Sequence, residues 1–164
     1  MIKGRGALTF SPVEHSCSQP PLPLAMSLFA IRCPPTPAVP QAKRNGLEEY
    51  KNQHIRNSIF FDLDANSKKE TNLPHMLVDQ KSWEQIISKM GIKNEDEIVV
   101  YDNSDVISSC RCWFNFIYFG HNPKLVHVLN GGLKKWIKEN KEVTNEATSI
   151  KISNYKSFEK KRAC

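Results

Sequence analysis

An alternation of apolar runs with helix-patterned segments begins near residue 46 and limits what this chain can fold into. Runs rich in β-branched and aromatic residues, typical of strands, cover 58–63, 98–101 and 125–129. A helical segment follows each of them, at 81–90, at 107–119 and after Gly131. This order predicts an α/β fold, with a parallel sheet covered by helices on both faces and joined by right-handed crossovers. Because 107–119 is apolar nearly all round, it is predicted to be a buried helix.

The first forty residues contrast with the rest of the chain, because they contain eight of its ten prolines. Proline lacks an amide hydrogen and fixes φ, so it interrupts both helices and central strands. We therefore expect 1–44 to be extended or disordered, without a core of its own. The predicted organisation is this segment, a domain over 45–146, and a basic tail over 147–164 where a linker would begin.

The formal charge of +6 comes from the two ends of the chain. Residues 41–150 contain 15 Lys and Arg against 15 Asp and Glu, so the body of the chain is neutral and nucleic-acid binding is not expected. No apolar stretch is long enough to span a membrane. The five cysteines are odd in number and irregularly spaced, which favours a reducing compartment. The expected location is the cytoplasm, with mitochondria as the alternative because the N-terminus is poor in acidic residues.

Two junctions between a predicted strand and the following helix fall within 99–108 and 128–133. In open parallel sheets such junctions form the working surface. Four segments around them, in order, resemble motifs of the rhodanese family: His54-Ile55-Arg56-Asn57-Ser58-Ile59, Leu73-Pro74-His75-Met76-Leu77, Ser109-Cys110-Arg111-Cys112-Trp113-Phe114 and Asn130-Gly131-Gly132-Leu133-Lys134-Lys135-Trp136. The match is to the first, non-catalytic domain of tandem thiosulfate and 3-mercaptopyruvate sulfurtransferases. It covers about 45–143.

The resemblance implies a rhodanese-like three-layer fold and places Asp102 where an active domain carries its nucleophilic cysteine. In such domains a loop of backbone amides and a helix N-terminus hold the persulfide anion. A carboxylate can accept the same hydrogen bonds but cannot become a persulfide. Asn103, Ser104 and Asp105 continue the loop, and the charge of Asp105 would repel an anionic sulfur donor. We therefore expect no catalytic residue in this chain, and loop or structural roles for these four residues, Arg111, Gly131 and Gly132.

The resemblance also implies a first strand ahead of residue 47. Since the proline-rich stretch occupies that place, the sheet is predicted to lack its first strand. The chain is then expected to be a fragment of a longer sulfurtransferase or the product of a truncated reading frame. Such a chain would be marginally stable and would expose a strand edge and a domain-docking face.

The remaining reactive side chains have ordinary interpretations. Cys110 and Cys112 point to opposite sides of a helix and are expected to be core residues. Arg111 is expected to pair with Asp62, Asp64 or Asp102, or alternatively to face a catalytic domain and an anionic substrate. His75 and His121 are expected to be capping or core residues. Asp62 and Asp64 lack a third metal ligand, so no metal or other cofactor is expected.

Three functions remain open from the sequence. The chain is either the non-catalytic half that supports a cysteine-bearing rhodanese domain, a free-standing non-catalytic binding or regulatory module, or an active sulfurtransferase using Cys110 or Cys112. The expected partner is a catalytic rhodanese domain, through which small anionic sulfur donors would be bound. Neither nucleic acid nor a membrane is expected as a partner.

Overall fold

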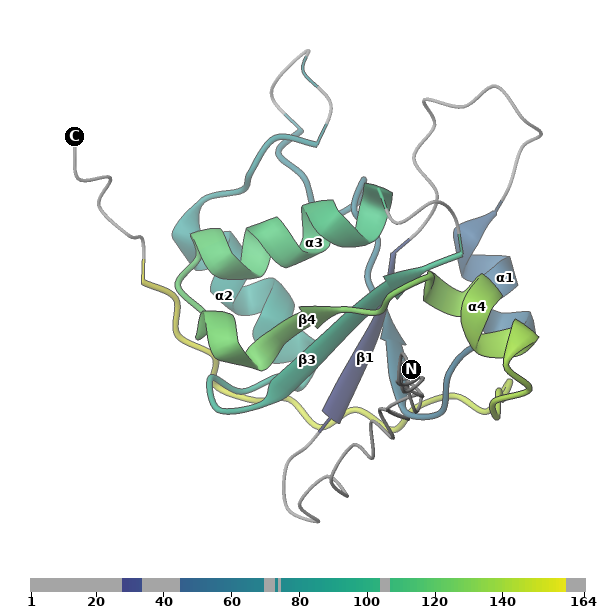
Figure 1. The fold of residues 1–164 in the computed structure, drawn as a ribbon. Helices are drawn as coiled ribbons and strands as arrows, with labels where there is room; N and C mark the ends of the chain where they lie inside the picture. The colour runs from purple at the N-terminus through teal and green to yellow at the C-terminus, as the bar shows by residue number, and fades with distance from the viewer. Residues whose placement is uncertain (1–27, 34–44, 70–72, 74, 104–106, 159–164) are drawn as a thin grey trace, which may run out of the picture.

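A parallel four-stranded sheet forms the centre of the computed structural model, which describes residues 28–33, 45–69, 73, 75–103 and 107–158 (Figure 1). The strand order is β2-β1-β3-β4. The strands are β1 (Leu28–Cys33), β2 (Ser58–Phe60), β3 (Glu97–Asp102) and β4 (Val126–Val128). All three strand pairs are parallel, which confirms the predicted sheet.

Strand β1 corrects the prediction that the first strand is missing. It lies between β2 and β3 and pairs with β3 from Leu28↔Glu97 to Cys33↔Asp102. The prediction treated the proline-rich segment as uniform, but Pro23 and Pro34 enclose ten residues without a proline. Leu28-Phe29-Ala30-Ile31 within that window is apolar enough for a central strand. The rest of the expected 1–44 segment lies outside the described residues.

Helices cover both faces of the sheet, as predicted (Figure 1). In the picture, α2 (Gln80–Lys89) and α3 (Ile107–Tyr118) lie on one side, and α1 (Gly46–Asn52) and α4 (Gly132–Lys138) on the other. Asn45 and Asp79 cap α1 and α2 by accepting hydrogen bonds from backbone amides of the first turn. A short 3-10 turn, η1 (Pro123–Leu125), leads into β4.

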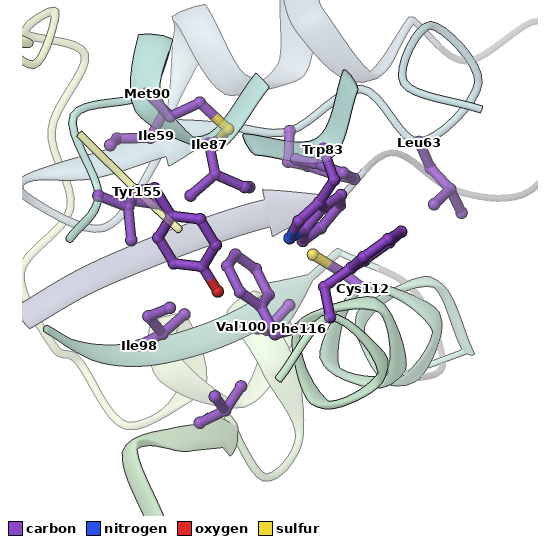
Figure 2. Close-up of a cluster of buried hydrophobic side chains, with 14 residues drawn as sticks. Ile59, Leu63, Trp83, Ile87, Met90, Ile98, Val100, Cys112, Phe116 and Tyr155 are labelled. Atoms are coloured by element: carbon purple, nitrogen blue, oxygen red, sulfur yellow. The ribbon is translucent and has the colours of Figure 1, made fainter. Parts of the chain in front are cut away.

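The main core lies between the sheet and the α2–α3 layer (Figure 2). Trp83 is fully buried, stacks on Phe119 at 4.7 Å between ring centroids, and meets Phe116 edge-on at 5.2 Å. Aromatic pairs of this kind stabilise a core beyond the area that they bury. The helical spacing 83–86–87–90 therefore points into this core, as predicted.

The expected all-round burial of α3 is wrong on its outer side. Cys112, Phe116 and Phe119 are fully buried, but Trp113 and Phe114 keep 36% and 39% of their surface exposed. One side of the helix packs on the sheet, and large side chains on the other side remain partly exposed. An apolar pattern alone does not distinguish a helix covered on all sides from one with an uncovered apolar face.

The described part of the expected basic tail, 147–158, packs against the body of the domain. Tyr155 is 1% exposed and belongs to the main core, and Ser157 is 3% exposed. The backbone amide of Ser157 donates to Glu84 Oε1 at 2.8 Å, and Gln80 Nε2 donates to the carbonyl of Ser157 at 2.7 Å. Lys156 lies between the two buried residues Tyr155 and Ser157, so a basic side chain here does not indicate a free tail.

Candidate functional site

The end of β3 places Asp102 in the interior, at the carboxyl edge of the sheet. Its side chain is fully buried, and the backbone amide of Ser109 donates to its Oδ2 at 3.1 Å. Ser109 lies in the first turn of α3, where unpaired amides and the helix dipole favour an acceptor. The strand end and the helix start thus form an anion-accepting position, and a carboxylate occupies it.

Gly132 brings the start of α4 against the same strand end. Its φ is +54°, and a Cβ at this position would lie 2.6 Å from the backbone oxygen of Asp102. Gly131 precedes it with φ of +80° and occupies the N-cap position of α4. Only residues without a side chain allow this turn and this close approach. The Gly-Gly pair therefore positions α4 beside Asp102.

The loop after β3 is described only in part. Asn103 Nδ2 donates to Glu49 Oε2 of α1 at 3.2 Å, which ties the loop to the other face of the sheet. Ser104 and Asp105 lie outside the described residues. The expected repulsion of anions by Asp105 therefore stays a prediction.

The two cysteines of α3 differ in their surroundings. Cys112 is fully buried in the main core, whereas Cys110 is exposed. Their opposite directions agree with the prediction, but the expected core position of Cys110 is wrong. Neither replaces Asp102 at the strand end, since Cys110 lies on the outer side of the helix and Cys112 faces the core.

A second group of polar residues lies after β2 along the chain and consists of Asp64, His75 and Arg111. His75 Nδ1 lies 3.1 Å from Asp64 Oδ1, close enough for an ion pair with a protonated ring, although the atoms are not aligned as a hydrogen bond. Arg111 Nη2 donates to the backbone oxygen of His75 at 2.5 Å. Among the described contacts Arg111 has this carbonyl partner in place of the expected ion pair with Asp62, Asp64 or Asp102.

The sequence analysis missed this group because it considered His75 only as a capping or core residue. The available signal was the position of Asp64 just after a strand, since residues at strand ends gather at one edge of a parallel sheet. The side chain of Asp62 accepts the backbone amide of Ala65 at 2.9 Å and so stabilises a turn. No cluster of three or more His, Cys, Asp or Glu side chains able to hold a metal occurs within the described ranges.

His121 is a core residue, as expected. It is 2% exposed, and its Nε2 lies 3.1 Å from the backbone oxygen of Asp96 and its Nδ1 3.2 Å from the Tyr155 hydroxyl. Burial lowers the pKa of His121 and raises the pKa of Tyr155 to about 12. The neutral ring therefore donates from Nε2 to the carbonyl and accepts the tyrosine proton at Nδ1. These contacts are structural.

Comparison with protein-family models matches residues 45–139 to the rhodanese-like domain family. "Thiosulfate/3-mercaptopyruvate sulfurtransferase 1, mitochondrial" from Arabidopsis thaliana is 41% identical over 114 residues, which are 70% of this chain and 30% of that protein. Thiosulfate sulfurtransferase from Gallus gallus is 33% identical over 109 residues, or 65% of this chain and 37% of that protein. The chain spans about a third of the length of these curated relatives.

Solved structures agree with this assignment. The 3-mercaptopyruvate sulfurtransferase SseA from Escherichia coli superimposes with a TM-score of 0.74 at 27% identity, covering 82% of this chain and 50% of that one. Tum1 from Saccharomyces cerevisiae gives a TM-score of 0.71 at 27% identity, over 82% of this chain and 44% of that one.

Among the described residues no helix is long and apolar enough to cross a membrane.

Proposed function

Because the chain belongs to the rhodanese-like domain family, with thiosulfate/3-mercaptopyruvate sulfurtransferases among its relatives, we propose that it is the non-catalytic half of such an enzyme. In this role it supports a second rhodanese domain, which carries the reactive cysteine and binds the anionic sulfur donor. The single observation that carries the proposal is the buried Asp102 carboxylate at the carboxyl end of β3.

The chemistry of the strand end supports this role. Sulfur transfer through a persulfide needs a thiolate held by backbone amides. Asp102 accepts the Ser109 amide that could otherwise stabilise such an anion, and a carboxylate cannot store a sulfane sulfur. The strand end therefore keeps the hydrogen-bonding arrangement of an anion site without its nucleophile.

The lengths of the relatives favour a supporting half over a free-standing module. The chain covers 50% and 44% of the two solved relatives, so each contains about as much polypeptide again. A free-standing binding or regulatory module remains the second candidate function. The third candidate is an active enzyme, and the observation behind it is the exposed Cys110.

We propose that the protein is located in the cytoplasm. Mitochondria are the alternative, because the name of the Arabidopsis relative includes that organelle.

A chimaera tests the proposed role in a full-length protein. The 114 aligned residues of the Arabidopsis mitochondrial relative are replaced by the matching residues of this chain, and thiocyanate formation from thiosulfate and cyanide is measured. If the chain is a supporting half, the chimaera retains activity within about tenfold of the parent enzyme, equivalent to roughly 1.4 kcal/mol of transition-state free energy.

The control is a second chimaera in which Cys110 and Cys112 are both replaced by alanine. It should remain as active as the first, because neither thiol takes part in the reaction. A folded but inactive first chimaera would mean that the replaced segment carried the essential chemistry, and it would refute the supporting role. Activity that disappears only in the control would favour the third candidate.

A further inference from the structure

The outer side of α3 is an uncovered apolar surface. Of the twelve residues of this helix only Arg111 is charged, whereas a helix on a protein surface normally carries charged residues on its outer face. Trp113 and Phe114 are 36% and 39% exposed, and the Phe114 ring lies 6.0 Å from the half-buried Tyr118. We call these three residues, together with the exposed Cys110, the α3 apolar face.

The loop before α2 extends this surface. Leu73 and Met76 are 62% and 40% exposed. Arg111 connects the loop to the helix, because its Nη2 donates to the His75 backbone oxygen and its guanidinium lies 5.4 Å from the centre of the Phe114 ring. Large exposed side chains gathered in this way mark an interaction surface.

Arg111 also indicates which chemical group a partner would bring to this surface. Its Nε is buried and has no hydrogen-bond partner among the residues that the structure describes, and a buried guanidinium N–H normally has an acceptor. An apolar surface that includes a guanidinium with a donor still available for a partner fits a protein face that is apolar around a carboxylate or carbonyl oxygen.

The path of the chain indicates which partner this is. The last described residue, Phe158, donates its backbone amide to the oxygen of Phe119 at 3.0 Å, directly after α3. A Cβ on Gly120 would clash with the backbone oxygen of Phe158. The two backbones therefore lie in direct contact, which holds the segment against the end of the helix. A domain that follows this segment would be attached next to Phe119, whose ring lies 5.1 Å from that of Tyr118 in the α3 apolar face.

We propose that the α3 apolar face, with Leu73, Met76 and Arg111, is the surface on which the second rhodanese domain docks. The inference rests on the proposed function and adds the surface and its central residue, Phe114. Ile137 of α4, also 39% exposed, is on the opposite side of the sheet and provides a matched control.

Hydroxyl-radical footprinting with mass spectrometry tests the docking surface directly. The full chain alone and the Arabidopsis chimaera are labelled in parallel, and the labelling of each side chain is compared. We expect Met76, Trp113 and Phe114 to be labelled several-fold less in the chimaera, because the second domain covers the centre of an interface. Ile137 should be labelled equally in both proteins.

Two substitutions in the chimaera complete the test. Phe114→Glu should restore most of the labelling at Met76 and Trp113, and Ile137→Glu should leave their protection unchanged. Equal labelling in the two proteins, or protection at Ile137 instead, would overturn the docking surface. Protection that grows with the concentration of the isolated chain would show that a second copy is the occupant, which also overturns the proposal.

Footprinting and thiocyanate formation separate the two claims. A chimaera that is active but shows no protection of the α3 apolar face would retain the proposed function and refute this docking surface. A chimaera that protects the face and is inactive would retain the docking surface and refute the function.

Discussion

At the scale of single residues, the carboxyl end of β3 combines two features that sequence reasoning could anticipate. The motif match predicts that Asp102 stands at the place of a nucleophile, and the structure buries that side chain beside the first turn of α3. The Gly131-Gly132 pair was expected to open a helix, and it does. The sequence did not indicate that Gly132 lies against the backbone of Asp102, because these two residues are far apart along the chain.

Replacement of Asp102 tests its structural contribution. Asp102→Ala removes a buried acceptor of the Ser109 amide, so we expect a loss of about 1–3 kcal/mol in the free energy of unfolding. Asp102→Asn keeps an acceptor of similar size and should lose clearly less. Urea denaturation of the three proteins measures both differences. Equal stability of Asp102→Ala and the parent chain would contradict the hydrogen-bonding role.

Gly132→Ala tests the close approach of α4 to β3. An added Cβ would meet the Asp102 carbonyl at 2.6 Å with φ at +54°, and such strain costs about 1–3 kcal/mol. Lys138→Ala, at an exposed position on the same helix, is the control and should change little. Thermal unfolding distinguishes the two, and a Gly132→Ala protein as stable as the control would show that the turn relaxes freely.

At the scale of elements, the helices and strands after residue 46 were predictable because local patterns specify them. The spacing of Trp83 and Ile87 and the stop at Gly91 were enough to locate α2. The central position of β1 was not predictable in this way, since strand order depends on pairing between segments far apart in the chain. The proline count of its surroundings then outweighed the apolar character of 28–31.

The two faces of α3 should differ in thiol reactivity. Under native conditions we expect iodoacetamide to alkylate Cys110 and to leave Cys112 unmodified, because the first is exposed and the second is fully buried. Peptide mass spectrometry assigns the modified residue. Modification of Cys112 at the same rate as Cys110 would contradict the orientation of the helix, and alkylation in denaturant provides the control for intrinsic reactivity.

The contact between His121 and the 151–158 segment predicts a dependence of stability on pH. Burial holds the pKa of His121 below its ordinary value of 6.5, so in mildly acidic solution the unfolded chain binds a proton that the folded chain does not. The free energy of unfolding is therefore highest above pH 6.5. It decreases as the pH falls from 6.5 towards the lowered pKa of His121 in the folded state.

The control for this prediction is His121→Gln, which removes the titrating ring. Burial raises the pKa of Asp96, which acts in the opposite direction, and the charge of His121 acts on that carboxyl, so the difference between the two pH profiles reports the His121–Asp96 pair. Free energies of unfolding at several pH values between 7.5 and 5 provide the measurement. Parallel pH profiles for the two proteins would contradict the assignment to His121.

At the scale of the whole molecule, the α2–α3 layer is buried on its inner side, whereas the outer side of α3 remains partly exposed. The main core closes over α2, α3 and Tyr155, while the outer side of α3 keeps large apolar side chains exposed. The sequence predicted a docking face in general terms from the family resemblance. It could not locate that face, because the pattern of α3 is equally apolar on its covered and uncovered sides.

We propose that a carboxylate stands where sulfur transfer needs a thiol. A sulfurtransferase assay on the 164-residue chain is the direct test of this proposal. The purified, folded chain is incubated with thiosulfate and cyanide, and thiocyanate is measured against a protein-free blank. We expect no thiocyanate above the blank. Catalytic turnover by this chain would contradict it, because some other group would then have to carry the sulfur that Asp102 cannot.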